Sequence, residues 1–87
     1  MKTLYVYENA RLRREGLKSI ARTMQGAKVS RNVIEYAGNK FYFVSMDNFD
    51  HARGLQYHSW YKMGDFELQT WQTDLLDSHV RKSPECD

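Results

Sequence analysis

The chain has 87 residues, of which 41% are hydrophobic and 14% aromatic, and its formal net charge is +2. This length allows one small domain that buries roughly 60–65% of the surface its unfolded chain exposes, and so many aromatic rings argue against disorder. The single cysteine, Cys86, excludes an internal disulfide, and no apolar run has the length of a membrane span or of a signal-peptide core. We therefore expect a soluble cytoplasmic protein.

The charges divide unevenly between the two halves of the chain. Residues 1–40 hold nine basic and three acidic groups, a net charge of +6, whereas residues 41–87 hold four basic and eight acidic groups, a net charge of −4. This division predicts one surface suited to polyanions or acidic partners. The alternative is that the two halves neutralise each other within the fold, since surface charge is often merely solvated.

The first two predicted elements are a strand and a helix. Residues 3–7, TLYVY, are β-branched and aromatic, which is typical of a strand. Asn9 is suited to cap a helix over residues 10–25, which Gly26 ends. Gly16 costs this helix about 1 kcal/mol relative to alanine, so we expect it to mark a close approach to the sheet. The apolar stripe of the helix is Leu17, Ile20, Ala21 and Met24.

A β-hairpin is the clearest local prediction. Two β-rich runs, residues 33–37 and 40–46, are joined by Gly38 and Asn39, which suit a two-residue turn. The second run is almost continuously apolar or aromatic, which is typical of a strand covered on both faces.

The rest of the chain predicts a short helical turn, a strand and a second helix. Residues 47–55 suit a helical turn that stops at Gly54, and Gly64 and Asp65 end the strand over residues 56–63. That strand places Tyr57, Ser59 and Tyr61 on one side and His58 and Trp60 on the other. The second helix, over residues 67–81, has Leu68, Trp71 and Leu75 on one face and Gln72, Asp74 and Asp77 outward.

Together these elements predict an α/β or α+β fold. The strand–helix–strand order favours parallel pairing through a right-handed crossover, and the hairpin adds an antiparallel strand. We expect one domain over residues 1–81, with a small mixed sheet of about four strands packed by two helices. Residues 82–87 are expected to be a flexible tail.

The order of these segments resembles the core of P-loop NTPases of the terminase and helicase kind. The resemblance covers roughly residues 3–68 and includes the hairpin, ARGL at residues 52–55, and YKMGDFEL, where that family has its Walker B acids. No G-x-x-x-x-G-K-[ST] sequence is present to hold nucleotide phosphates, and the acids Asp65 and Glu67 are not adjacent. The resemblance therefore implies a scaffold without its nucleotide chemistry, as in small phage accessory proteins.

Neither metal binding nor catalysis is expected. The candidate ligands lack the spacing of a zinc site; they are His51, His58, Asp47, Asp50 and Cys86. Cys86 lies in the predicted tail, where nothing orients a base beside it. The carboxylate pairs Asp65/Glu67 and Asp47/Asp50 are more simply explained as turn or cap residues. We therefore predict no enzymatic activity, no catalytic residue and no cofactor.

A basic stripe on the first helix is the main predicted binding surface. It consists of Arg11, Arg14, Lys18 and Arg22, at positions i, i+3, i+7 and i+11, and is extended past the helix by Lys28 and Arg31. Such groups can neutralise several phosphates, and exposed aromatic residues of FYF or YHSWY can stack on bases. The alternative is a solvated helix face, since no known DNA- or RNA-binding signature is present.

Aromatic residues are the second predicted feature for binding. Tyr, Trp and Arg dominate interface hot spots, which makes Trp60 and Tyr61 the expected anchors unless the helices cover both faces. We predict a non-enzymatic regulatory protein, of the phage accessory or counter-defence kind, that docks on and inhibits a host protein or nucleoprotein complex in the host cytoplasm. Direct binding of RNA or single-stranded DNA is the alternative, and a nucleotide-handling or hydrolytic enzyme is a remote one. A hairpin edge strand also allows a homodimer, and no membrane partner is expected.

Overall fold

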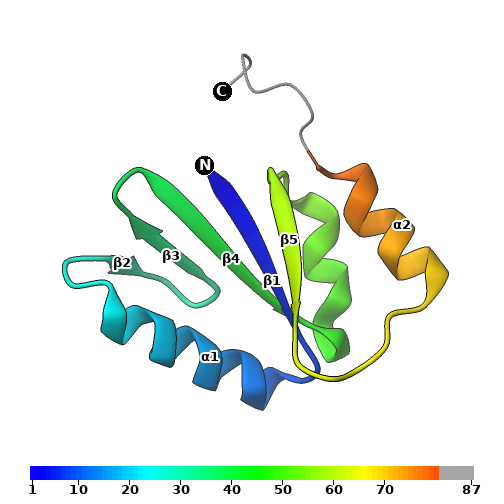
Figure 1. Cartoon of the computed structure of the whole chain (residues 1–87), viewed down its shortest axis with the longest axis horizontal. Coiled ribbons are helices and arrows are strands. Elements are labelled where there is room, and N and C mark those ends of the chain that lie inside the picture. Colours follow the sequence, from blue (N-terminus) through cyan, green and yellow to red (C-terminus); the bar gives the residue numbers. More distant parts are fainter. Residues whose placement is uncertain (81–87) are drawn as a thin grey trace.

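The computed structural model describes residues 1–80 as a five-stranded mixed sheet with helices on both sides (Figure 1). The strand order is β2-β3-β4-β1-β5. Strands β4 and β5 flank β1 and run parallel to it, whereas β2, β3 and β4 pair antiparallel. The elements are β1 (Lys2–Tyr7), α1 (Ala10–Thr23), β2 (Lys28–Val29), β3 (Val33–Tyr36), β4 (Asn39–Ser45), the 3-10 helix η1 (Met46–Gly54), β5 (Ser59–Met63) and α2 (Thr70–Ser78).

The predicted mixed α/β architecture is confirmed, with one strand more than expected. The additional strand, β2, pairs with β3. It has only two residues, which is too short for an alternation of apolar and polar residues to be recognised in the sequence. Within residues 1–80, no helix combines the length and the hydropathy needed to cross a membrane. The predicted tail over residues 82–87, which includes Cys86, lies outside the described residues.

One face of the sheet, called here the η1 face, is covered by η1 and α2. Because side chains alternate along a strand, Leu4 and Val6 of β1 both point to this face, where they pack with Phe49 of η1 and Leu76 of α2. Tyr57, which precedes β5, is fully buried in the same cluster. Its hydroxyl donates to the carbonyl oxygen of Leu76 at 2.8 Å, so the buried polar atom is satisfied.

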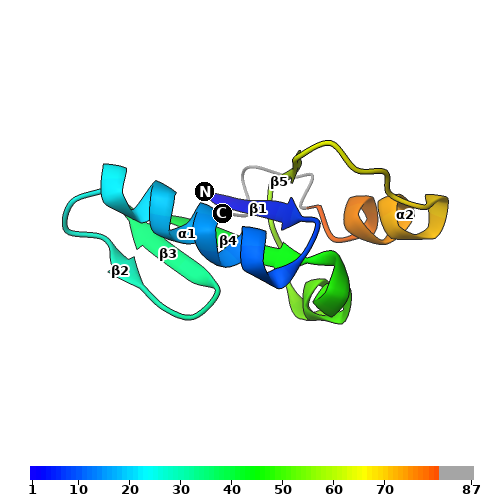
Figure 2. The ribbon, with the colours of Figure 1, turned by 90° about the horizontal axis from the view of Figure 1, so that it is seen from below.

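The opposite face, called here the α1 face, is covered by α1 near the carboxyl ends of the parallel strands. Figure 2 shows η1 below the strands, and α1 packs in the separate cluster of the other face. Leu17 of α1 packs with Tyr7 and Phe43 of the sheet. Asn9 caps the helix as predicted, since its Oδ1 accepts a hydrogen bond from the Leu12 N–H at 2.9 Å. A Cβ atom at Gly16 would overlap the Tyr7 ring, which confirms the predicted close approach.

The β3–β4 hairpin is confirmed, but its turn begins one residue earlier than predicted. Tyr36 pairs with Asn39, so the turn residues are Ala37 and Gly38 rather than Gly38 and Asn39. Their φ angles are 53° and 79°, as a type I′ turn requires. The register is set by Ile34, which pairs with Phe41 and is fully buried on the α1 face. A shift of one residue would move Ile34 to the other face.

The second helix presents a different side to the core from the predicted one. Leu68 precedes the helix, Trp71 is half exposed, and the buried residues are Gln72 and Leu76. Gln69 and Gln72 form a capping box, in which the Gln69 N–H donates to Gln72 Oε1 at 2.8 Å. This local pairing holds Gln72 inward and sets the helical phase, which apolar periodicity alone does not reveal.

The strand predicted over residues 56–63 is shorter than expected. β5 begins at Ser59, so Tyr57 does not follow its alternation and lies on the η1 face in the cluster that Trp60 packs against. Tyr61 lies on the opposite, α1 face, since it pairs with Tyr5 and the two rings are stacked. Tyr57 and Tyr61 therefore do not share a side as predicted.

Candidate binding surfaces

At the carboxyl ends of the parallel strands, a small cluster of polar groups is hydrogen-bonded within the chain. Open α/β sheets bind ligands at this edge, where successive connections leave toward opposite faces. In this chain α1 follows β1 on one side and η1 follows β4 on the other (Figure 2). Between them, the Asp47 carboxylate accepts hydrogen bonds from the Ser45 hydroxyl at 2.5 Å and from the Ala10 N–H at 3.1 Å. The Ser45 bond, and then the Ala10 bond, lower the pKa of Asp47.

Asp47 therefore holds a negative charge at the N-terminus of α1. A helix N-terminus favours anions through its free N–H groups and its dipole, and here the chain supplies that anion itself. A phosphate at this point would meet a carboxylate rather than an open cradle. The N-terminus of α1 is thus capped by a carboxylate of the chain itself, from Asp47, which lies far from Ala10 in the sequence.

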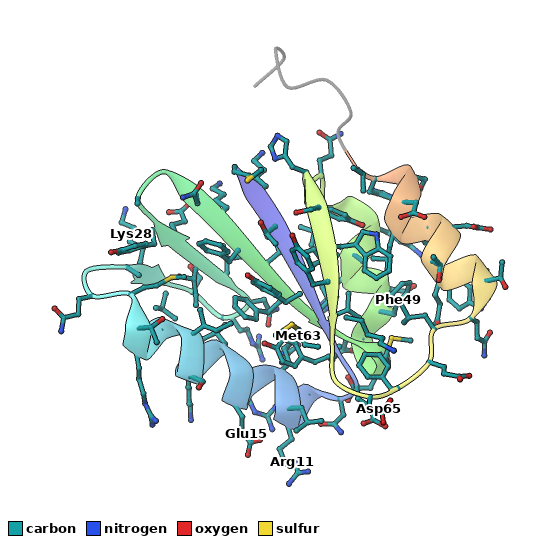
Figure 3. The ribbon with its side chains drawn as sticks, viewed as in Figure 1. Arg11, Glu15, Lys28, Phe49, Met63 and Asp65 are labelled. Atoms are coloured by element: carbon teal, nitrogen blue, oxygen red, sulfur yellow. The ribbon has the colours of Figure 1, made fainter. Side chains whose placement is uncertain are left out.

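The other residues considered for metal binding or catalysis are dispersed. Asp50 makes an ion pair with Arg53 within η1 at 3.0 Å, and the His58 Nδ1 accepts a hydrogen bond from the Lys2 N–H at 3.0 Å. Asp65 is exposed beyond the end of β5, near Met63 (Figure 3). Within residues 1–80, no three His, Cys, Asp or Glu side chains are grouped so that they could hold a metal ion.

The basic stripe of α1, defined as Arg11, Arg14, Lys18 and Arg22, lies on the side of the helix opposite its packed residues. All four residues are exposed. Figure 3 shows Arg11 and the neighbouring Glu15 pointing away from the sheet. In the described part of the chain, the ion pairs are Lys40–Glu35 and Arg53–Asp50, so no member of the stripe has an internal counter-ion.

The two residues expected to extend the stripe, Lys28 and Arg31, are also exposed but lie beyond the helix. Lys28 belongs to β2, and Figure 3 shows it at the end of the molecule away from Arg11. It lines an open hollow of about 490 Å³ between Gly26 and the hairpin tip, together with Tyr36 and Lys40. Lys28 therefore belongs to a separate surface at the hairpin end.

The two predicted aromatic anchors lie on opposite faces of β5. Trp60 packs against the cluster of the η1 face, and its indole N–H donates to Asp77 Oδ1 at 2.9 Å. Tyr61 lies on the α1 face and is 53% exposed. Tyr61 is thus available to a partner on a surface that Trp60 does not share.

Tyr61 belongs to a row of three rings, defined here as the aromatic band, which crosses β5, β1 and β4. The ring centroids of Tyr61 and Tyr5 are 6.0 Å apart, and those of Tyr5 and Phe41 are 6.3 Å apart. Tyr5 and Phe41 are only partly buried, and both pack against the cluster of the α1 face. Burial, and then the neighbouring Tyr61, raise the pKa of Tyr5. The alternation in TLYVY places Tyr5 on the same face as Thr3 and Tyr7, but only the strand order shows which residues of other strands lie beside it.

No protein family, curated protein or solved structure was found to match this chain. Its function is therefore inferred from these surfaces.

Proposed function

We propose that this chain is a non-enzymatic binding protein that docks through the basic stripe of α1 on an acidic protein surface, alone or within a nucleoprotein complex, and blocks that surface. The observation that carries the proposal is the set of four exposed cations on one side of a capped helix, none with an internal counter-ion among residues 1–80. The opposite side of α1 is fixed on the sheet through Leu17. A partner therefore meets a preorganised charged surface, which raises the association rate and selects partners of opposite charge.

Glu15 favours a protein partner over a phosphate backbone for this stripe. Its carboxylate points outward beside Arg11, from the same side of the helix (Figure 3). A phosphate backbone is uniformly negative, so a carboxylate within the contact surface would repel it. A protein surface can offer a cation opposite Glu15 and acids opposite the four basic residues, because protein interfaces pair both signs of charge.

The non-enzymatic part of the proposal is supported by the carboxyl edge of the sheet. Asp47 is held by Ser45 and Ala10 where an α/β enzyme would bind its ligand. The resemblance of residues 3–68 to a P-loop scaffold without its phosphate-binding sequence also supports placing the chain among small phage accessory or counter-defence factors.

Charge reversal on α1 tests the proposal. The tagged chain is used to capture its partner from the natural host, with and without nuclease. The double variant Arg14→Glu, Lys18→Glu is expected to lose the partner while its unfolding free energy changes by no more than about 0.5 kcal/mol. Arg53→Glu is the control, because Arg53 is exposed but lies in η1, on the other side of the sheet. Retention of the partner by the double variant would show that α1 is not the contact surface.

Glu15→Lys distinguishes an acidic protein surface from a nucleic acid as the partner of the basic stripe. It is expected to weaken binding to a protein that places a cation opposite Glu15. The same change would strengthen binding to a nucleic acid, since it replaces a repulsive charge by an attractive one. Stronger binding that disappears on nuclease treatment would therefore rule out the protein surface as the target.

A further inference from the structure

We infer that the basic stripe of α1 also binds the acidic surface of α2 in a second copy of this chain, so that the chain associates with itself head to tail. The acidic surface is defined here as Glu67, Asp74 and Asp77 together with the exposed ring of Trp71. This self-association rests on the proposed function in that it uses the same stripe. A second copy and an acidic partner therefore exclude each other, which makes self-association a regulator of docking.

The segment that carries α2 is the acidic counterpart of α1. Residues 64–80 contain four acidic residues and neither lysine nor arginine. Because α2 turns Gln72 and Leu76 toward the core, Asp74 and Asp77 remain exposed, as does Glu67 before the helix. Neither ion pair found within residues 1–80 includes any of these three acids. The acidic surface therefore lacks an internal counter-ion, as the basic stripe does.

Trp71 gives the acidic surface an aromatic anchor. It is 50% exposed, yet its orientation is fixed by two contacts. Its indole N–H donates to Gln69 Oε1 at 2.7 Å, and its ring meets Phe49 edge-on at a centroid distance of 5.7 Å. An exposed ring that is already held in place loses little freedom on binding, and tryptophan and arginine are typical of interface hot spots. A cation of the stripe can stack on the exposed part of this ring.

The two surfaces match in both signs of charge. The basic stripe has four cations and one neighbouring acid, Glu15, beside Arg11 (Figure 3). The acidic surface has three acids and one neighbouring cation, Lys62. The ammonium group of Lys62 donates to the carbonyl oxygen of Phe66, which directly precedes Glu67. A second copy therefore offers acids to the stripe and a cation to Glu15, and such complementarity selects one partner among many.

The positions of the two helices allow contact between copies rather than within one. Figure 1 shows α1 toward the β2 end of the molecule and α2 at the opposite end, beyond β5. At 1.5 Å per residue, the stripe runs about 16 Å along α1 and α2 is about 14 Å long, so one can lie along the other. A contact between two different patches is heterologous, and it can repeat from copy to copy in a ring or an open row.

Sedimentation velocity of the whole chain at increasing concentration measures this self-association. The wild type should exceed its monomer mass of 10.3 kDa at about 0.05 M salt and return to it at about 0.5 M, since salt screens exposed charges. Arg14→Glu, Lys18→Glu reverses the stripe. Glu67→Lys, Asp74→Lys reverses the acidic surface. Each double variant should stay monomeric alone, but an equal mixture should associate, because one variant is then acidic at both surfaces and the other basic at both.

Single variants define the contact further. Trp71→Ala should weaken self-association about tenfold, whereas Trp71→Phe, which keeps a ring, should weaken it less. Arg53→Glu and Asp50→Lys are the controls, because both residues are exposed in η1 and belong to neither surface. Asp77 is left unchanged, since it accepts a hydrogen bond from the Trp60 indole at 2.9 Å. Thermal unfolding of each variant checks that the fold is retained.

The inference is overturned if the wild type stays monomeric at low salt, if either double variant associates like the wild type, or if their mixture stays monomeric. Pairing through the hairpin edge would survive both reversals. The proposed function is tested separately by capture from the host. Glu67→Lys, Asp74→Lys keeps the stripe and should keep the host partner. Capture by a wild-type chain that does not self-associate contradicts this inference alone, and self-association without any captured partner contradicts the proposed function alone.

Discussion

Two parts of the α1 face differ in how far their aromatic side chains are buried. The rings that α1 covers, Tyr7 and Phe43, are 6% and 1% exposed. In the aromatic band, Tyr5 and Phe41 are partly exposed and Tyr61 is 53% exposed, although Tyr5 pairs with both Phe43 and Tyr61 in the sheet register. A single helix of 14 residues covers only part of one face of a five-stranded sheet. In a chain this small, part of the sheet therefore stays unburied, and its rings contribute less to stability than the rings under α1.

The largest expected difference between the covered rings and the aromatic band is in the unfolding free energy lost on truncating an aromatic ring. Phe43→Ala should lower the unfolding free energy by about 3–5 kcal/mol, since it leaves a cavity under α1. Tyr61→Ala should cost about 1 kcal/mol or less, because half of the side chain is already in water. Urea denaturation of both variants measures this. Similar losses at the two positions would mean that the band is core rather than surface.

The contact between α1 and the sheet gives the next largest effect. Replacing a helix glycine by alanine usually stabilises by about 1 kcal/mol, but at Gly16 the added Cβ would overlap the buried Tyr7 ring. Gly16→Ala is therefore expected to destabilise by about 1–3 kcal/mol. Ser19→Ala, at an exposed position of the same helix, is the control and should be neutral or slightly stabilising. A stabilised Gly16→Ala variant would show that the helix packs less closely than described.

The hairpin tip, which no helix covers in the described residues, should respond to substitution in the opposite direction. Ala37 has a φ of 53°, a left-handed conformation that costs alanine roughly 1–2 kcal/mol. Asparagine tolerates this conformation and Asn-Gly is the preferred sequence of a type I′ turn, so Ala37→Asn should raise the unfolding free energy by about 0.5–1 kcal/mol. Ala37→Val should destabilise. Thermal unfolding distinguishes the two variants, and no gain from asparagine would contradict the left-handed conformation of residue 37.

The smallest expected effect is the acid dependence contributed by the carboxyl end. The folded-state pKa of Asp47 is lowered from 3.8, first by the Ser45 hydroxyl and then by the Ala10 N–H. Its ionised form therefore stabilises the fold above pH 3.8, and this contribution is lost as the pH falls through the lower folded pKa. Asp47→Asn should flatten that part of the stability curve. Denaturant midpoints of the wild type and of Asp47→Asn, measured from neutral pH to below 3.8, test this acid dependence. Asp74→Asn, at an exposed position of α2, is the control. Parallel curves for the wild type and Asp47→Asn would show that Asp47 does not contribute to the acid dependence.

Local sequence patterns predicted most of the fold but only part of the binding surfaces. The cap at Asn9, the close approach at Gly16 and the pairing of the hairpin strands follow from residues near one another in the sequence, and all three are confirmed, although the hairpin turn lies one residue earlier than predicted. Which side of α2 faces the core depends on the Gln69–Gln72 capping box, and the spacing of the apolar residues predicts a different side.

The surfaces themselves depend on residues far apart in the chain. Asp47 and Ala10 meet only because β1 and β4 are neighbours. The aromatic band joins Tyr5, Phe41 and Tyr61 from three strands, so the strand order has to be known before the band can be recognised. The sequence could therefore indicate Tyr61 as an exposed anchor but not the rings beside it.

The position of β1 has a consequence for how the chain folds. It precedes the other four strands in the chain, yet its two hydrogen-bonding edges are completed by β4, which follows α1, β2 and β3, and by β5, which follows η1. Contacts this distant in sequence require large loops to close before they contribute stability, which slows folding. During synthesis, β1 therefore remains without either neighbouring strand until β4 and then β5 have emerged, and a nascent chain ending before β5 leaves one edge of β1 with unpaired backbone N–H and C=O groups.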